Sequence, residues 1–224
     1  MESIVILLLL AIGFGFYWLY QYRKPSRWFG QLHLASMNRS HAELTDWGLS
    51  HVGIGDAFHI LDVGCGGGRT LERLAAIAVA GQVHGIDNAE GSVLASKRWN
   101  AEAIRQGRIH VALASVEAIP FPDRSFDLVT AVETQYFWPD LDQAMQEVDR
   151  VLKPGGQFMV IAEYYRKETR EPMVGWGLAL LRAHRLSLQE HRELLMRAGF
   201  VDIRILEEVD RGWLCAIGCK PMQP

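Results

Sequence analysis

Apolar and polar positions follow two different periods along the chain, and the period separates predicted strands from predicted helices. Short apolar runs that end at glycine or at polar residues predict strands at 59–63, 82–87, 109–115, 126–133, 157–163, 201–206 and 213–219. Apolar residues spaced three and four apart predict helices at 33–52, 69–79, 89–105 and 141–151. Because strands and helices alternate from the first strand onward, we expect an α/β fold with a doubly wound sheet.

The end of the chain predicts the last part of this sheet. Ser187 and Glu190 have the spacing of a helix capping box, and Gly199 is placed to end that helix. The two strands that follow, 201–206 and 213–219, are joined by a short connection and should pair antiparallel. The expected fold is therefore a Rossmann-like, seven-stranded sheet that is mostly parallel and has an antiparallel last strand.

The N-terminal segment has a different pattern. Residues 3–20 carry no charge, and 18 helical residues would span roughly 27 Å, close to the apolar thickness of a bilayer. Aromatic residues gather at 17–22, and Arg23, Lys24 and Arg27 follow them. Aromatic residues next to cations are typical of a membrane interface, with the cations on the cytoplasmic side. We expect a single transmembrane helix, with the rest of the chain in the cytoplasm.

Two other interpretations of this segment remain open. A signal peptide would have positive charge before the apolar run and small residues at a cleavage site, whereas Glu2 precedes this run. A buried helix of a soluble protein is compatible with Gly13 and Gly15, which weaken the segment. The expected organisation is a membrane anchor at 1–24, a linker and covering helix at 25–58, and one domain at 59–224.

Composition and charge exclude several classes of protein. The 224 residues have a formal net charge of −3, which gives no basic surface for nucleic acid. The three cysteines, Cys65, Cys215 and Cys219, form no CxxC pair and indicate neither a zinc site nor a disulfide framework. No ligand spacing indicates a metal ion, so none is expected.

A glycine-rich turn follows the first predicted strand, in the sequence Ile60-Leu61-Asp62-Val63-Gly64-Cys65-Gly66-Gly67-Gly68-Arg69. Glycines at this point let the backbone approach a ligand, although a tight turn without a ligand would look the same. The dinucleotide motif G-x-G-x-x-G would need glycine at Arg69, which argues against a nicotinamide or flavin cofactor. The carboxylate of Asp62 would repel a phosphate but would tolerate a cationic sulfonium.

The second predicted strand ends at Asp87, about twenty residues after the glycines. A carboxylate in this position can accept hydrogen bonds from both hydroxyls of a ribose. Aspartate is equally suited to cap the next helix, and this alternative stays open.

These residues resemble class I S-adenosylmethionine-dependent methyltransferases, in particular the ubiquinone/menaquinone-type and other small-molecule enzymes. The resemblance covers roughly 59–163 and rests on four ordered stretches: 61–68, 85–87, 116–127 and 151–156. It implies S-adenosyl-L-methionine as cofactor, bound by Asp62, Gly64, Cys65, Gly66, Gly68, Asp87, Asn88, Ser115, Val116, Glu117 and Glu133. Ser115 departs from the family, which often has aspartate there for the adenine amino group.

Methyl transfer needs few protein groups, because the cofactor carries the reactivity. Glu133, at the end of the fourth strand, and His41, in the helix before the domain, are the candidate catalytic residues. An orienting contact to the cofactor or a turn cap is an equal alternative for Glu133, and a lone histidine is more often structural. The aromatic residues 136–138 could form a substrate wall or pack internally, and the long connection 164–186 could cover a substrate.

The expected function is S-adenosylmethionine-dependent methylation of a small, lipophilic molecule beside the membrane. A non-catalytic membrane scaffold that binds the cofactor is an alternative, and a nicotinamide-dependent reductase is a weaker one. The methyl acceptor, the acceptor atom and the oligomeric state stay open.

Overall fold

The structure, a computed structural model, describes residues 41–166 and 183–222. Within these ranges no helix is both long and apolar enough to cross a membrane. The predicted anchor at 1–24 and most of the connection at 164–186 lie outside the described residues.

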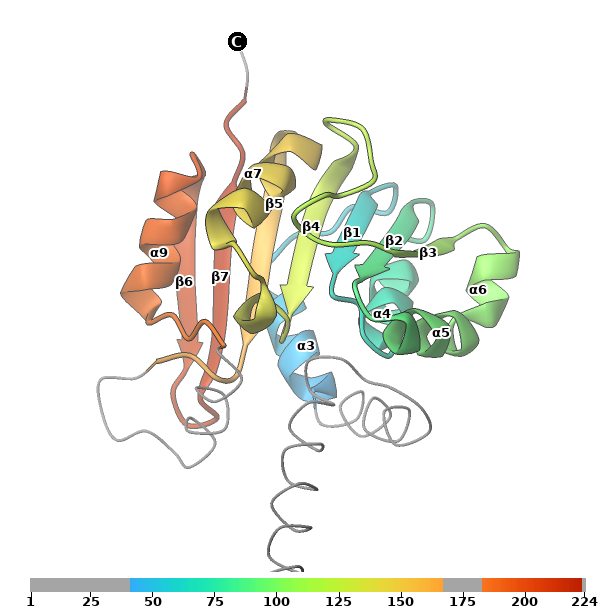
Figure 1. Cartoon of the computed structure of the whole chain (residues 1–224), viewed down its shortest axis with the longest axis horizontal. Helices are drawn as coiled ribbons and strands as arrows, with labels where there is room; N and C mark the ends of the chain where they lie inside the picture. Colours follow the sequence, from blue (N-terminus) through green and yellow to red (C-terminus); the bar gives the residue numbers. More distant parts are fainter. Residues whose placement is uncertain (1–40, 167–182, 223–224) are drawn as a thin grey trace, which may run out of the picture.

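One seven-stranded sheet organises the described chain (Figure 1). Its strands are β1 (His59–Val63), β2 (Gln82–Asp87), β3 (Ile109–Leu113), β4 (Phe126–Val132), β5 (Leu152–Ala162), β6 (Val201–Glu208) and β7 (Trp213–Cys219). Their order across the sheet is β3-β2-β1-β4-β5-β7-β6. Neighbouring strands from β3 to β5 pair in parallel, and β7 runs antiparallel to both β5 and β6. The predicted mixed sheet with an antiparallel last strand is confirmed.

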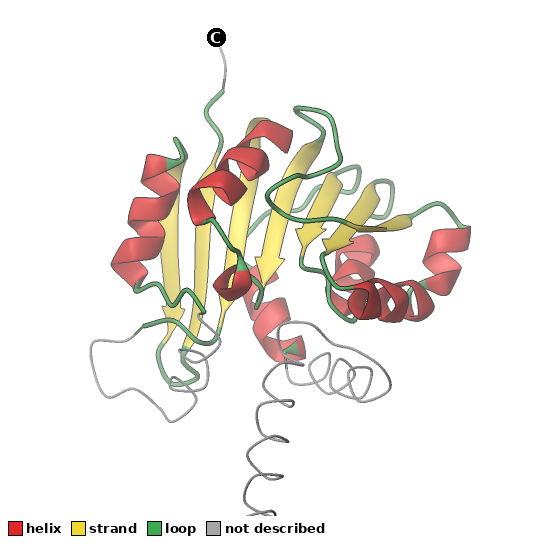
Figure 2. Ribbon diagram, viewed as in Figure 1, coloured by secondary structure: helices red, strands yellow, loops and turns green. Residues whose placement is uncertain are grey.

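Helices cover both faces of this sheet (Figure 2). They are α3 (Ala42–Leu49), α4 (Arg69–Ile77), α5 (Glu90–Trp99), α6 (Ala101–Arg105), α7 (Leu141–Val151) and α9 (Leu188–Arg197). Buried residues of α7 and α9 form one apolar core with one face of the sheet. Residues of α3 and α4, including Leu44 and Leu71, form a second core with the other face. The two buried cores hold the strands rigidly, and this rigidity fixes the loops at their ends.

Several predicted bounds are wrong in detail, and two of these differences have a clear physical reason. The helix expected at 89–105 is two helices, because Asn100 leaves helical geometry with φ −101° and ψ 21°. The Asn100 side chain instead donates to the carbonyl of Gly68, at 2.9 Å, and so ties this break to the glycine-rich turn. The strand expected at 157–163 begins earlier, at Leu152, and its pairing with β4 skips 153–156. The predicted turn residues therefore form an irregularity inside a longer strand.

The capping box of the last helix is confirmed and gives a stability prediction. Ser187 Oγ accepts from the Glu190 N–H at 3.2 Å, and Glu190 Oε2 accepts from the Ser187 N–H at 2.7 Å. The Ser187→Ala change should therefore lower the free energy of unfolding by about 1 kcal/mol, measured by urea denaturation. The matched change Gln189→Ala, at an exposed position of the same turn, should shift it by less than about 0.5 kcal/mol. Equal effects of the two changes would show that the cap contributes nothing.

Candidate functional site

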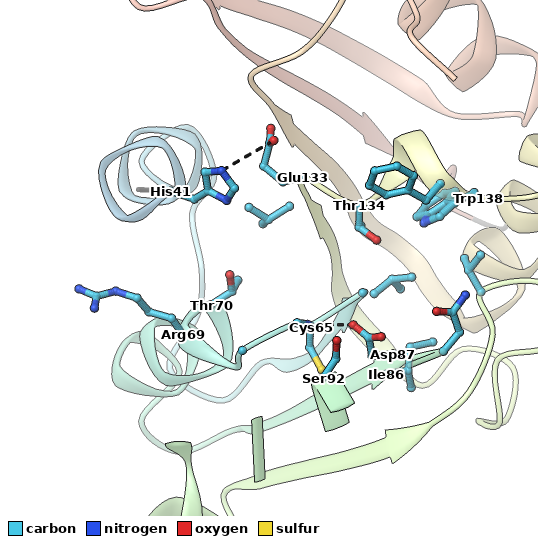
Figure 3. A pocket seen from close by; sticks show the side chains of 18 of the residues that line it. His41, Cys65, Arg69, Thr70, Ile86, Asp87, Ser92, Glu133, Thr134 and Trp138 are labelled. Carbon is cyan, nitrogen blue, oxygen red and sulfur yellow. Dashed lines mark hydrogen bonds and ion pairs between the residues drawn. The ribbon is translucent and has the colours of Figure 1, made fainter. Parts of the chain in front are cut away.

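A cavity lies at the edge of the sheet where β1, β2 and β4 end, and α3 closes one side of it (Figure 3). Most of the residues predicted for the site line this cavity: His41, Gly64, Cys65, Gly66, Asp87, Asn88, Ser115, Val116 and Glu133. Asp62, Gly68 and Glu117 were also predicted, but they do not line it. Ligands of open α/β sheets bind at this edge because the loops after parallel strands converge there.

The glycine-rich turn forms the floor of the cavity. Gly64 and Gly66 have φ values of +76° and +50°, in the left-handed region that side chains other than glycine avoid. The N–H groups of Gly64 and Cys65 both donate to the carbonyl of Ile86, at 2.7 and 3.0 Å. A β-carbon on Gly64 would come within 2.0 Å of Thr134 Oγ1. Glycine is therefore required at 64 both by the backbone angle and by the contact between β1 and β4.

Asp87 joins the glycine-rich turn to the end of β2. Its Oδ2 accepts from the Gly66 N–H at 3.0 Å, and its Oδ1 accepts from the Ala89 N–H at 2.9 Å. A carboxylate offers about four acceptor sites. Asp87, which also has a side-chain hydrogen bond with Ser92, can therefore organise the turn and still accept from a ribose. Burial raises the pKa of Asp87, and the two backbone donors act against that shift. The predicted alternative, a local cap, and the predicted ribose contact are thus compatible.

The end of β3 supplies the next part of the cavity wall. Ser115 and Val116 line the cavity, whereas Glu117 does not. Ser115 Oγ accepts from the Glu117 N–H at 3.3 Å. The hydroxyl of Ser115 therefore stabilises the loop that follows β3. A planar ligand in the cavity would contact this hydroxyl and the apolar side chain of Val116.

Two predicted residues, Asp62 and Gly68, lie outside the cavity lining and stabilise the glycine-rich turn. Asp62 is 1% exposed, and Thr130 Oγ1 donates to its Oδ1 at 2.7 Å. Burial raises the pKa of Asp62 to about 7, against the effect of the Thr130 hydrogen bond. Gly68, with φ +84°, begins α4 and packs against Ser96 and Asn100. These two residues shape the loop without facing the cavity.

His41, at the start of α3, and Glu133, after β4, line the opposite end of the cavity, and Glu163, after β5, forms a cluster with them from outside the lining. His41 Nε2 lies 4.0 Å from Glu133 Oε2 and 4.0 Å from Glu163 Oε2. Figure 3 shows the His41 ring and the Glu133 carboxyl group facing each other across the cavity from Asp87. The three groups could also hold a cation, because each offers a ligand atom within 4.8 Å of the others.

Glu133 is the most constrained member of this cluster. It has φ +55° and is 9% exposed. Its Oε1 accepts from the Tyr136 hydroxyl at 2.8 Å and from the Glu163 N–H, which leaves Oε2 directed toward His41. Burial raises the pKa of Glu133 to about 8, and the charge of Glu163 raises it further, while the two donors lower it. A positive charge near Oε2 would restore the ionised form.

The predicted aromatic wall is divided between two roles. Phe137 and Trp138 line the cavity. Tyr136 is 3% exposed, and its hydroxyl accepts from the N–H groups of Glu163 and Tyr164 at 3.1 and 3.0 Å. Tyr136 therefore fixes Glu133 and the end of β5, and it does not contact the cavity.

Glu163 is one of the residues near the cavity that the sequence analysis missed, and Thr70, Ser92 and Thr134, which line it, are others. Glu163 ends the predicted strand 157–163 as Glu133 ends the predicted strand 126–133, and these strands are neighbours. Acidic residues at the carboxyl ends of two adjacent parallel strands must lie near each other. This pattern could have identified Glu163, whereas nothing in the sequence indicates its distance from His41, which lies 122 positions earlier.

Comparison with known proteins agrees with this geometry. Residues 61–160 match a family model described as a methyltransferase domain. A demethylmenaquinone methyltransferase of Symbiobacterium thermophilum is 38% identical over 104 residues, which are 46% of this chain and 41% of that protein. A cycloartenol-C-24-methyltransferase of rice (Oryza sativa subsp. japonica) is 30% identical over 203 residues, 85% of this chain and 56% of that protein. The chain spans about half the length of these curated relatives.

A solved structure shows the same fold. The S-adenosylmethionine-dependent methyltransferase of Aquifex aeolicus has a TM-score of 0.69 and 20% identity, and the match covers 84% of this chain and 97% of that one. The motifs, the order of the strands and the match to a methyltransferase domain all indicate S-adenosylmethionine as the cofactor. Residues 61–160 therefore form a methyltransferase domain, and the described chain is similar in motifs and fold to the class I S-adenosylmethionine-dependent methyltransferases.

Proposed function

We propose that the protein transfers a methyl group from S-adenosylmethionine to a small, lipophilic molecule. The observation that carries this proposal is one continuous cavity that joins the glycine-rich turn and Asp87 to His41 and Glu133. Such a cavity provides a place for a nucleoside at one end and for a reacting molecule at the other.

The residues present fit this cofactor. The glycine-rich turn exposes backbone to the cavity, and Asp87, at the end of β2, can accept hydrogen bonds from hydroxyls. When bound, S-adenosylmethionine supplies an activated methyl group. The chain itself would bind and orient the nucleoside through Asp87, Asn88 and Ser115, and Phe137 and Trp138 would exclude water from the acceptor.

His41 and Glu133 are the candidates to take a proton from the acceptor. Both line the cavity, and Tyr136 holds Glu133 in place through its hydroxyl. A base in this position is useful when the acceptor must lose a proton before or during the transfer.

A lipophilic acceptor is supported by two features. The relatives described above are named for demethylmenaquinone and cycloartenol, which are both rich in hydrocarbon. The cavity wall contains Phe137, Trp138 and Val132, which can contact an apolar molecule.

Transfer is tested with S-adenosylmethionine that carries a radioactive methyl group, incubated with the full chain and a lipid extract. The expected result is radioactive label in a product that dissolves in organic solvent. Adding the unlabelled acceptor, purified from the extract, should then lower the label found in other products. Cofactor binding without transfer to any quinone, sterol, amine or fatty acid would contradict an enzymatic role and favour a cofactor-binding scaffold.

We also propose that residues 1–24 anchor the protein in a membrane, with the methyltransferase domain on the cytoplasmic side. The uncharged run at 3–20 and the cations that follow it support this proposal. The full chain should float with lipid vesicles in a density gradient, and a chain that begins at Ser26 should remain at the bottom. Flotation of both forms, or of neither, would contradict the anchor.

The proposed orientation is tested with protease added outside intact cells. The protease should leave the methyltransferase domain uncut, and cleavage of the domain would contradict a cytoplasmic position.

A further inference from the structure

We propose that the methyl acceptor is an amine, whose protonated nitrogen is bound by His41 and Glu133, with Glu163 adding a second negative charge beside them. This inference rests on the proposed methyl transfer and names the class of acceptor for the same cavity. It concerns the cluster of His41, Glu133 and Glu163, which the cofactor contacts do not require.

The first support is the kind of hydrogen bonding that the cluster offers. Glu133 Oε1 already accepts from the Tyr136 hydroxyl and the Glu163 N–H. Its Oε2 faces the cavity side of the cluster, 4.0 Å from His41 Nε2, which is beyond hydrogen-bond distance. A nitrogen that lies to one side of the line joining Glu133 Oε2 and His41 Nε2 can come within hydrogen-bond distance, about 2.8 Å, of both atoms. An ammonium group has three N–H donors.

The second support is the charge around the cluster. Two carboxyl groups, those of Glu133 and Glu163, each lie 4.0 Å from His41 Nε2, and their side chains are 5% and 33% exposed. Among the described residues that line the cavity, Arg69 is the one lysine or arginine, and it extends from α4 away from His41 and Glu133 (Figure 3). A cation is therefore stabilised at this end of the cavity, while a carboxylate, phenolate or thiolate acceptor would be repelled.

The third support is the fate of charge during the reaction. A proton first moves from the ammonium nitrogen to His41, which leaves a neutral amine with a free electron pair and keeps Glu133 available as a carboxylate. A nitrogen–carbon bond then forms as the carbon–sulfur bond of the sulfonium breaks, and the electrons of that bond stay on sulfur. The positive charge passes from sulfur to nitrogen, so it arrives where Glu133 and Glu163 stabilise it.

The aromatic lining suits the rest of such a molecule. Phe137 and Trp138 follow Glu133 in the chain and line the same cavity. Aromatic faces attract an ammonium group and also contact an apolar body. The acceptor we infer is therefore an amine with an apolar or aromatic substituent.

The experiment compares three probes with the same ring and different head groups: phenethylamine, 2-phenylethanol and phenylacetate. Each is titrated calorimetrically at pH 7 into the full chain in detergent micelles, saturated with S-adenosylhomocysteine. Phenethylamine should bind at least about ten-fold more tightly than 2-phenylethanol, and phenylacetate should not bind measurably. Equal or tighter binding of the alcohol or the acid would overturn the proposal.

Variants locate the effect in the cluster. Glu133→Gln keeps the shape of the side chain and should weaken phenethylamine binding about ten-fold or more, with 2-phenylethanol unchanged. Glu163→Gln should weaken it less, and Glu90→Gln, at an exposed position of α5, should have no effect. Equal losses for the amine and the alcohol in Glu133→Gln would contradict the assignment.

Two further arms separate this proposal from other outcomes. S-adenosylhomocysteine binding is measured for each variant first, so that failure of the cofactor site is recognised separately from failure of the amine site. Zn²⁺ alone is titrated into the same protein. Stoichiometric Zn²⁺ binding that is lost in both Glu133→Gln and Glu163→Gln, without selectivity for the amine probe, would overturn the amine proposal and make the cluster a metal site.

Discussion

Replacing Asp87 with alanine should weaken the binding of S-adenosylhomocysteine by about 100-fold or more. Each hydrogen bond to a charged group contributes about 1.5–3 kcal/mol, and a ribose offers two hydroxyls to this carboxylate. A loss of about 3 kcal/mol corresponds to roughly 100-fold in the dissociation constant. Calorimetric titration of wild-type and variant protein measures the difference.

Asp87 also accepts from the Gly66 and Ala89 N–H groups, so the alanine variant loses loop contacts as well as ligand contacts. Asp87→Asn separates the two effects, because its amide oxygen can keep one backbone donor but its NH₂ group cannot accept. We expect the Asp87→Asn protein to be folded and to bind S-adenosylhomocysteine with an affinity between those of the wild type and of Asp87→Ala. Glu90→Gln removes a nearby exposed charge and should bind like wild type. Wild-type affinity in Asp87→Ala would remove Asp87 from the cofactor site.

Gly64→Ala should cause the largest loss of stability among single substitutions in the loop. Alanine at φ +76° is strained by about 1–2 kcal/mol, and its β-carbon would lie 2.0 Å from Thr134 Oγ1. The floor of the cavity would have to move away from β4 to relieve this contact. We expect a decrease of at least about 2 kcal/mol in the free energy of unfolding, measured in urea, together with loss of cofactor binding.

Gly53→Ala is the matched control for this change. A β-carbon at Gly53 meets nothing within 4 Å, and its backbone lies outside the left-handed region. Alanine there should leave stability unchanged or raise it slightly, because it restricts the unfolded chain. A Gly64→Ala protein as stable as the Gly53→Ala protein would show that the turn is not constrained as the structure indicates.

The sequence predicted the sheet well because each strand is a short apolar run with a clear end. β1 and β2 begin and end at the predicted residues, His59–Val63 and Gln82–Asp87. The glycine-rich turn after the first strand and Asp87 after the second also predicted one end of the cavity correctly, because residues of both line it. In a parallel sheet, adjacent strands bring their carboxyl ends together, so local motifs become neighbours without any information about side chains.

The rest depended on contacts between distant segments. The break at Asn100 exists because its side chain satisfies Gly68, 32 residues earlier, and helical periodicity continues across it. The left-handed backbone of Glu133 and the hydroxyl of Tyr136 direct one carboxyl oxygen toward His41. Periodicity and propensity describe neighbours along the chain, and they contain no measure of such long-range geometry.

The most direct test is a titration of the full chain with S-adenosylhomocysteine, beside an identical titration with NADH. We expect one S-adenosylhomocysteine to bind per chain with a dissociation constant on the order of micromolar, and NADH not to bind. Binding of NADH alone, or of neither ligand by protein that is shown to be folded, would contradict the assignment of this cavity to S-adenosylmethionine.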